Sequence, residues 1–286
     1  MIIVKLSGGL GNQLFQYVLA RYLSIKNKCQ FKLDITGFET YKLHNYTLSN
    51  FNIVENIANR LEILWLKNPI RAQIDHHLTI SNQSHVRDRG FTFDPFVFNV
   101  GKSVYLDGYW QSEKYFKDVE QIIGQDLTLR NPLGEGAENI ATQIVGQESV
   151  SLHIRRGDYA NRERTKKVHG LCSLDYYYKS IDLILNKVST PIFFIFSDDI
   201  KWARENLDMR DLPVVFVSDG NNKIKNFEEL HLMSLCRHNI IANSSFSWWG
   251  AWLNRNANKI VITPKQWFAD ESKNTKDLIP DSWISL

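Results

Sequence analysis

The sequence is poor in cysteine, and its three cysteines follow no pattern typical of a metal site or a disulfide framework. Cys29, Cys172 and Cys236 lie far apart and are odd in number. No two of them have the short spacing of zinc ligands. We therefore expect reduced, structural cysteines in a reducing compartment.

Long apolar runs are missing as well. No stretch of roughly 18 apolar residues occurs, so no segment is expected to span a bilayer. The short apolar run Met1–Leu6 ends at Gly8, Gly9 and Gly11, which does not fit a secretory signal. An enzyme of the cytoplasm is the simplest expectation.

Neither sign of charge dominates the sequence. Lys and Arg number 34 against 31 Asp and Glu, which gives a net charge of +3. Proteins that bind nucleic acid take much of their affinity from a strongly basic surface, so a nucleic-acid partner is not expected. A local basic pocket for a phosphate is still allowed. Internal repeats, low-complexity tracts, a nucleophile elbow, a zinc motif and a Gly-Lys-Ser/Thr phosphate loop are all absent from the sequence.

What is present has the composition of a globular protein. The chain has 286 residues, 43% of them hydrophobic and 23% charged, which is enough for one large or two modest domains. Met1–Ser7 is a short β-rich run, a glycine turn follows, and Leu14–Ile25 has apolar residues at helical spacing. With a second predicted strand at Cys29–Asp34, this is the opening of an α/β unit.

The next part is less regular. Residues 38–100 are rich in aromatics, His and Asn, with a helix expected at Ile57–Leu66. A strand is predicted at Val104–Tyr109 and a helix at Glu113–Ile123. Asn131–Gly146 begins with Pro and Gly and becomes an amphipathic helix. We place the lobes at residues 1–135 and 147–286, with 136–146 as their connection.

After residue 147 short apolar strands alternate with helical segments, which predicts a doubly wound parallel sheet. The fold class expected for the whole chain is α/β. The predicted strands are Val150–Ile154, Pro191–Phe196, Val214–Val217, Asn239–Ala242 and Lys259–Ile262, and the helices are Leu174–Asn186, Ile200–Asn206, Phe227–Cys236 and Ser247–Leu253.

The most informative motif is Ser151–Tyr159 (SLHIRRGDY), which follows a predicted strand. Ligands of parallel α/β sheets bind beyond the carboxyl ends of the strands. Arg155 and Arg156 in that position have planar, paired donors that suit phosphate oxygens, and His153 precedes them. Fixed cations of this kind stabilise a diphosphate leaving group, as nucleotide-sugar chemistry requires. The alternative is a surface arginine pair held by Asp158 in a structural turn.

Two further motifs also follow predicted strands. In Ser7–Tyr17 (SGGLGNQLFQY), glycines allow backbone amides to approach a ligand, and the side chains of Asn12 and Gln13 suit a sugar hydroxyl or a phosphate. The spacing is not that of a dinucleotide fingerprint, and a tight turn with Asn12 as helix cap is the alternative. In Asn243–Leu253 (NSSFSWWGAWL), hydroxyls and free amides at a helix start form an anion site. The residues expected there are Asn243, Ser244, Ser245, Phe246 and Ser247, whereas at least two of the tryptophans are expected in the core.

A fourth motif, an acidic pair, also follows a predicted strand. Phe193–Asp199 (FFIFSDD) ends in Ser197, Asp198 and Asp199. Carboxylates here can hold a metal with a nucleotide or contact the nucleoside. Alternatively, Ser197 or Asp198 caps the next helix. No further carboxylate cluster lies nearby in the sequence, so a cap or ligand contact is favoured over a metal.

Taken together these motifs resemble the bacterial α-1,2-fucosyltransferases. The segments that carry the resemblance are GGLGNQLFQY, HIRRGDY, FIFSDD and NSSFSWWGAWLN, in the family's order and over nearly the whole chain. The wider superfamily, which includes the α-1,6- and protein O-fucosyltransferases, shares the arginine motif on a two-lobed GT-B fold. The resemblance therefore implies two Rossmann-like lobes with the active site in the cleft between them.

The resemblance implies GDP-β-L-fucose as donor, inversion to an α-linked product, and neither a cofactor nor an essential metal. By motif, Arg155 and Arg156 would hold the diphosphate. The other residues expected to bind the donor are Asn12, His153, Ser197, Asp198, Asn243, Ser244, Ser245, Phe246 and Ser247. For the general base, Asp158 lies in the motif, and Glu163 has the spacing at which α-1,6 relatives place a catalytic acid. A third option is that no strong base exists and leaving-group stabilisation dominates.

The acceptor side is expected in residues 38–100 and in Asp107–Ser112 (DGYWQS), because aromatic faces and amides suit sugar rings. The residues assigned to it are Gln13, Asp107, Trp110 and Gln111. The expected acceptor is galactose or a related hexose in a bacterial surface glycan such as O-antigen or capsule, which a lipid can carry. The basic and apolar segment Arg60–His77 allows peripheral contact with the inner face of the cytoplasmic membrane, although a solvated helix face explains it equally well.

Two other functions stay open at this point. A metal-dependent glycosyltransferase with another nucleotide sugar would use Asp198 and Asp199 as metal ligands. An inactive sugar-nucleotide-binding protein would keep the fold without turnover, but the intact Arg155–Arg156 pair argues against it.

Overall fold

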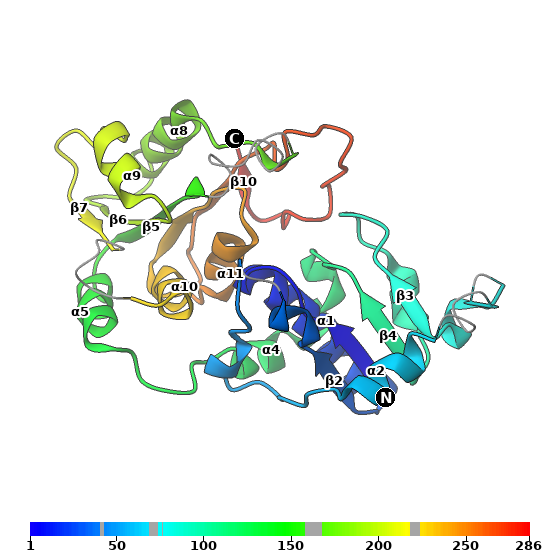
Figure 1. The fold of residues 1–286 in the computed structure, drawn as a ribbon. Helices are drawn as coiled ribbons and strands as arrows, with labels where there is room; N and C mark the ends of the chain where they lie inside the picture. The colour runs from blue at the N-terminus through cyan, green and yellow to red at the C-terminus, as the bar shows by residue number, and fades with distance from the viewer. Residues whose placement is uncertain (41–42, 69–73, 76, 158–167, 218–223) are drawn as a thin grey trace. The chain divides into compact units, whose positions relative to one another are not determined.

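A computed structural model describes residues 1–40, 43–68, 74–75, 77–157, 168–217 and 224–286 (Figure 1). The chain forms two compact units. Unit 1 consists of Met1–Asn131 with Asn274–Pro280, and unit 2 of Pro132–Lys273 with Asp281–Leu286. Each unit has its own parallel β-sheet.

Unit 1 contains a four-stranded sheet in the order β2-β1-β4-β3. All three strand pairs are parallel, so every strand ends at the same edge. The strands are β1 (Ile2–Lys5), β2 (Phe31–Asp34), β3 (His85–Arg87) and β4 (Val104–Asp107), and the α-helices are α1 (Leu10–Asn27), α2 (Arg60–Leu66) and α4 (Glu120–Asp126). Short 3-10 helices connect them: η1 (Thr36–Glu39), η2 (Leu48–Asn50), η3 (Ile80–Asn82), η4 (Pro95–Asn99), η5 (Glu113–Tyr115) and η6 (Lys117–Val119).

Helix α1 packs tightly in unit 1. Its apolar residues at helical spacing, among them Leu14, Val18 and Leu19, are fully buried. A polar contact fixes its far side, because the Tyr17 hydroxyl and the Arg21 Nε both donate to Asp126 of α4, at 2.6 and 2.8 Å. These contacts join the middle of α1 to α4 within unit 1.

Unit 2 contains a six-stranded sheet in the order β10-β9-β8-β5-β6-β7, again parallel throughout. Its strands are β5 (Ser149–Ile154), β6 (Ile192–Ser197), β7 (Val214–Phe216), β8 (His238–Ile240), β9 (Val261–Thr263) and β10 (Ile284–Ser285). Its helices are α5 (Glu135–Ile144), α8 (Leu174–Leu185), α9 (Ile200–Asn206), α10 (Asn226–Leu235) and α11 (Ser245–Leu253).

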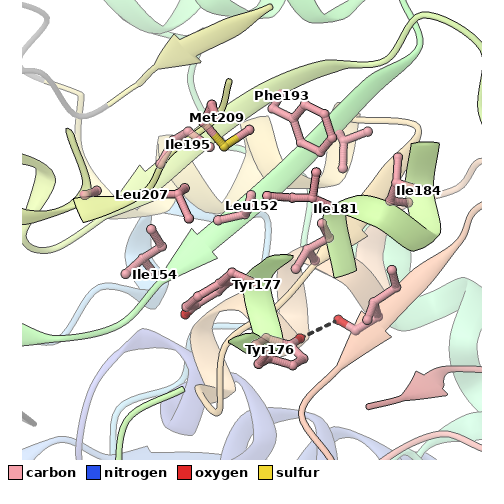
Figure 2. Close-up of a cluster of buried hydrophobic side chains, with 14 of the residues drawn as sticks. Leu152, Ile154, Tyr176, Tyr177, Ile181, Ile184, Phe193, Ile195, Leu207 and Met209 are labelled. Carbon is pink, nitrogen blue, oxygen red and sulfur yellow. Dashed lines mark hydrogen bonds between the residues drawn. The ribbon is translucent and has the colours of Figure 1, made fainter. Parts of the chain in front are cut away.

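Helices cover both faces of this sheet, as the alternation along β6 shows. Phe193 and Ile195 belong to the hydrophobic cluster under α8 and α9, drawn in Figure 2. Phe194 and Phe196 belong to the opposite cluster, with residues of α5 and α10. Successive side chains of a strand point to opposite faces, so one apolar run fills both layers.

The strand order reverses between β5 and β8. From β5 the chain runs outward through β6 and β7, and then returns to lay down β8, β9 and β10 on the other side. Sheets of this order bind ligands beyond the carboxyl ends of the strands at the point of reversal. The loops that follow β5 and β8 carry the arginine and serine motifs.

The predicted α/β class is confirmed, and so are the predicted strands, apart from their end residues. Two short strands, β3 and β10, were not predicted. The helix predicted at Glu113–Ile123 forms only from Glu120, after two 3-10 turns. The three tryptophans of α11 are in the core, as predicted for at least two of them, with Trp248 and Trp249 fully buried.

The division of the chain differs from the expected boundaries. Unit 1 ends at Asn131, and α5 packs against unit 2 through Ala137, Ile140 and Ile144 instead of forming a connection. The segment Asn274–Pro280 returns to unit 1, where Asp277 accepts hydrogen bonds from Phe93 N at 2.9 Å and, through its carbonyl, from the Ser112 hydroxyl at 2.6 Å. Such long-range contacts leave no local pattern in the sequence.

The structure also bears on disulfide bonds and on membrane-spanning helices. Cys29, Cys172 and Cys236 are free thiols, and burial raises the pKa of Cys172 to about 11. In the described ranges, no helix is both long and apolar enough to cross a membrane.

Truncating Leu152 at the centre of unit 2 should destabilise the fold strongly. This β5 side chain is fully buried among α8 and β6 residues (Figure 2), so Leu152→Ala leaves a cavity and should lower the free energy of unfolding by about 2–5 kcal/mol. Leu61→Ala is the matched control, because Leu61 is 78% exposed and should change stability by less than about 0.5 kcal/mol. Urea unfolding of the two variants checks this, and equal effects would contradict the packing described.

Candidate active site

The carboxyl end of β5 presents two arginines that one carboxylate holds. Arg155 Nη1 lies 2.8 Å from Asp198 Oδ2. The backbone N–H of Arg156 donates to Asp198 Oδ1 at 2.8 Å. Asp198 follows the neighbouring strand β6, so its carboxylate joins the two strand ends. Both guanidinium groups remain partly exposed, with about a fifth of each side chain accessible.

Arg156 is oriented differently from Arg155. Its guanidinium carbon lies 3.7 Å from the centre of the Trp202 ring in α9. Its Nε is buried, lacks a hydrogen-bond partner among the described residues, and lies 4.0 Å from Asp199 Oδ2. The ring therefore contributes most of the close contact that fixes the plane of this group.

Gly157 allows Asp198 to approach the arginines. A Cβ at this position would lie 2.6 Å from Asp198 Oδ2, closer than real contacts allow. Any other residue would push the carboxylate away from Arg155. The glycine of the motif thus serves the packing of the two strand ends.

His153 is neutral at physiological pH. It is buried at the end of β5, and this burial, helped by the nearby Arg155 charge, lowers its pKa to about 4 despite the opposing effect of Asp198. Its ring lies against Phe246, with centroids 5.7 Å apart. Nδ1 has no hydrogen-bond partner among the described residues. A neutral imidazole contributes a directional hydrogen bond and no charge.

The motif after β8 divides into supporting and accessible residues. Ser244 caps α11 by accepting from Phe246 N at 3.3 Å, and Ser247 donates to the Ser244 carbonyl at 3.4 Å. The Asn243 amide donates to the carbonyls of His169 and Trp267, at 2.8 and 3.1 Å. Ser245 and Phe246 are partly exposed, so they are the residues of this motif best placed for a ligand.

These groups surround the point where the strand order of unit 2 reverses. The end of β5 carries the two guanidinium groups and the neutral imidazole, and α11, which follows β8, adds its amino end. Cations and helix amino ends stabilise phosphate, and fixed donors need no reorganisation when charge develops. The arrangement suits a diphosphate.

Unit 1 joins its two motifs at the carboxyl ends of β1 and β4. Gln111 Nε2 donates to Asn12 Oδ1 at 2.7 Å, and Gln16 Nε2 donates to the Gly108 carbonyl at 3.0 Å. Gly8 has φ of +77°, and a Cβ there would lie 2.6 Å from the Asn12 amide nitrogen. Hydrogen bonds thus join the glycine turn and the start of α1 to the segment 107–112.

Two residues assigned to the acceptor side have structural partners instead of open donors. Gln13 is fully buried, and its amide donates to the carbonyls of Gly8 and Asn45 and accepts from Thr47 N. Asp107 pairs with Lys5 at 3.0 Å, and His85 and Lys5 beside it hold its pKa well below the usual range. Direct contact with a sugar would require breaking these contacts.

Trp110 is held in an unusual backbone conformation. Its φ is +56°, which is rare for an aromatic residue, and Asp88 Oδ2 accepts from its backbone N–H at 2.9 Å and from that of Tyr109 at 3.1 Å. The indole N–H is buried without a hydrogen-bond partner among the described residues. Strain of this kind is found mostly at functional sites.

Asp158 and Glu163 lie outside the described residues. Within the described part of the chain, no group of three or more His, Cys, Asp or Glu side chains is arranged to hold a metal ion. Ser197 accepts a hydrogen bond from Asp199 N at 3.0 Å. The residue that caps α9 is Asp199, which accepts from Trp202 N at 3.2 Å, and not Ser197 or Asp198 as the capping alternative expected.

Sequence reasoning missed Trp202 and Asp88. The sequence positions of both residues give a weak indication of a site. Trp202 lies in the first turn of the helix after the acidic pair, and Asp88 directly follows strand β3. Strand β3 was not predicted, so the position of Asp88 at a strand end was not visible.

Helix α2 exposes an apolar face. Leu61, Leu64 and Trp65 have i, i+3, i+4 spacing and are 78, 65 and 52% exposed. Contact of this face with a membrane stays a prediction.

Glycosyltransferases are the class of protein to which this fold and this arrangement of residues in unit 2 correspond. The chain belongs to glycosyl transferase family 11, whose family model matches residues 1–286. This confirms the resemblance stated from the motifs and the prediction of an enzyme.

Named relatives cover essentially the whole chain. An α-1,2-colitosyltransferase of Escherichia coli is 33% identical over 291 residues, covering 100% of this chain and 99% of the relative. The O-antigen biosynthesis glycosyltransferase WbnK of Escherichia coli is also 33% identical, covering 98 and 99%. Galactoside α-(1,2)-fucosyltransferase 2 of Hylobates lar is 26% identical, covering 86 and 67%.

Solved structures share the fold at low sequence identity. NodZ α-1,6-fucosyltransferase soaked with GDP-fucose matches with a TM-score of 0.51 at 14% identity, over 88% of this chain and 92% of that one. A mutant of Arabidopsis thaliana FUT1 in complex with GDP matches with a TM-score of 0.55 at 10% identity, over 98 and 72%. The GT-B-like fold class predicted from the sequence is thereby confirmed.

The buried His153 should make the protein less stable in acid. Its folded pKa of about 4 lies below the ordinary value of 6.5, so the unfolded chain takes up the proton first as the pH falls. The free energy of unfolding should therefore decrease from about pH 6.5 to about pH 4, and His153→Gln should flatten part of this dependence. Urea unfolding at several pH values measures it. Burial also lowers the pKa values of His231 and His238, so these two residues should account for pH dependence of stability that remains in His153→Gln. An unchanged pH dependence in His153→Gln would contradict the neutral, buried state.

Proposed function

We propose that the protein is an α-1,2-fucosyltransferase that transfers L-fucose, with inversion, from GDP-β-L-fucose to a galactose-type hydroxyl of a surface glycan such as O-antigen. The observation that carries this proposal is the pair Arg155 and Arg156, fixed by Asp198 and Trp202 at the strand reversal of unit 2. Cations in that position match the charge of a diphosphate.

The chemistry follows from what the reaction needs. As the bond from the sugar to the β-phosphate breaks, negative charge grows on the departing diphosphate. The two guanidinium groups stabilise this charge as bidentate donors, and the amino end of α11 adds backbone N–H groups. Neutral His153 donates or accepts one hydrogen bond without changing the charge of the pocket. Ser245 and Phe246 complete the donor side.

The names of the relatives support the donor class and leave two sugars to be tested. The family includes an α-1,2-colitosyltransferase and α-(1,2)-fucosyltransferases. Colitose is fucose without the 3-hydroxyl, so the two GDP sugars share the diphosphate, the methyl group and the ring. GDP-colitose is therefore the second candidate donor, favoured by the 33% identity of that relative.

The acceptor side is proposed for unit 1. Gln111, the backbone around Trp110 and the glycine turn meet at one edge of its sheet. An amide network beside a buried indole suits the hydroxyls and apolar face of a sugar. An acceptor carried by a lipid at the inner face of the cytoplasmic membrane fits the O-antigen biosynthesis named for WbnK and the exposed face of α2.

The general base and the metal are separate parts of the proposal. Asp158 and Glu163 are the candidates for deprotonating the acceptor hydroxyl. If neither acts, stabilisation of the leaving group alone supplies the rate enhancement. Asp198 and Asp199 engage Arg155, Arg156 and the start of α9, which supports transfer without a metal.

Turnover of GDP-fucose by the wild type and by Arg156→Ala tests the function. Purified proteins are incubated with GDP-fucose and a panel of β-galactosides in EDTA, and GDP and fucosylated product are measured. We expect product from the wild type and, for Arg156→Ala, a loss of about 2–4 kcal/mol in transition-state stabilisation, because a donor to the leaving group is removed.

Arg210→Ala is the control, since Arg210 is an exposed arginine of the same unit whose guanidinium lies 3.6 Å from Asp182 on α8, and it should leave turnover unchanged. Replacing GDP-fucose by GDP-colitose under the same conditions identifies the preferred sugar. Product that requires added metal would contradict the metal-free proposal. Turnover of another nucleotide sugar but of neither GDP sugar would refute the donor.

A further inference from the structure

We propose that Trp202 is a positioning residue that sets the plane of the Arg156 guanidinium for the diphosphate of the donor. This inference rests on the proposed function and adds to it a residue outside the motifs that carry the resemblance. Trp202 touches Arg156 and acts through it.

The Trp202 ring is the contact that orients the Arg156 guanidinium. The guanidinium carbon lies 3.7 Å from the Trp202 ring centre, within the range of a close stack. The Asp199 carboxylate lies 4.0 Å from Nε, beyond hydrogen-bond distance, and Nε has no hydrogen-bond partner among the described residues. Asp198 accepts a hydrogen bond from the backbone N–H of Arg156, whereas it pairs with the side chain of Arg155.

Trp202 is itself held by two kinds of contact. Its backbone N–H donates to the cap residue Asp199 at 3.2 Å, which places it in the first turn of α9. Its side chain packs against the hydrophobic cluster of α8 and β5 in unit 2. The ring is therefore a fixed surface beside the end of β5.

A stacked ring has an advantage over a second carboxylate. A carboxylate would neutralise Arg156 and compete with the phosphate for its in-plane N–H groups. An aromatic face holds the group from the side and leaves these donors and the positive charge available. Arg155, which pairs with Asp198 at 2.8 Å, lacks this freedom. The two arginines are thus held differently, and Arg156 has more of its in-plane donors available for the ligand than Arg155 has.

A double-mutant cycle tests the coupling between Trp202 and Arg156. Wild type, Trp202→Leu, Arg156→Ala and the double variant are compared by GDP affinity and by kcat and KM for the GDP sugar. We expect Trp202→Leu to lose about tenfold in GDP affinity and in kcat/KM, the range that a desolvated stack supplies. Trp202→Phe, which keeps an aromatic face, should recover most of this loss. In the Arg156→Ala background, Trp202→Leu should cause no further loss.

Phe216→Leu is the matched control. Arg204, also on α9, lies 4.2 Å from the Phe216 ring, so this variant removes a comparable stack away from the end of β5. It should leave GDP affinity and kcat/KM unchanged. If Trp202→Leu lowers the unfolding temperature below the assay range, Trp202→Met, which is unbranched and lacks a ring, takes its place.

Additive losses in the cycle, or a Trp202→Phe variant as impaired as Trp202→Leu, would overturn the inference while leaving the proposed function standing. A wild type that binds no GDP and uses no GDP sugar would overturn the proposed function and this inference together. Non-additive losses with rescue by Phe and an inert control support the positioning role.

Discussion

The interaction on which the donor side depends is the contact of one carboxylate with two adjacent arginines. Arg155 and Arg156 repel each other, and a strand end that carried them alone would be spread by their charges. Asp198 reaches across from the next strand, pairs with one guanidinium and bonds the backbone of the other. Gly157 makes room for this approach. The sheet itself thereby supports the two arginines, because the two strands that meet there are paired along six residue pairs.

Both units gather polar groups at the carboxyl ends of their strands, and these groups differ in charge. In unit 2, cations and a helix amino end gather where the strand order reverses. In unit 1, a glycine turn and the segment after β4 are joined by amides, with Asn12 and Gln111 bonded at 2.7 Å. Charge suits a diphosphate and neutral amides suit a sugar. The contrast between the two edges supports assigning the donor to unit 2 and the acceptor to unit 1.

The sequence alone predicted much of this, for identifiable reasons. The strands and helices of unit 2 were visible because both faces of its sheet are buried, which gives continuous apolar runs such as Phe193–Phe196. The arginine and serine motifs were visible because each directly follows such a strand. Trp202 and Asp88 were missed because their roles depend on contacts across the sheet edge. Gln13, assigned to the acceptor from its chemistry, is buried with its amide fully bonded, which only the path of residues 45–47 determines.

The central claim is that Arg156, with Arg155, binds the diphosphate of a guanine nucleotide, and calorimetric titration with GDP and GMP tests it most directly. The second phosphate should give the wild type an affinity for GDP about tenfold or more above that for GMP, the range of one or two charge-assisted bonds. In Arg156→Ala this ratio should fall towards one while GMP still binds. A ratio that is the same in both proteins, or a wild type that binds neither nucleotide, would contradict the account.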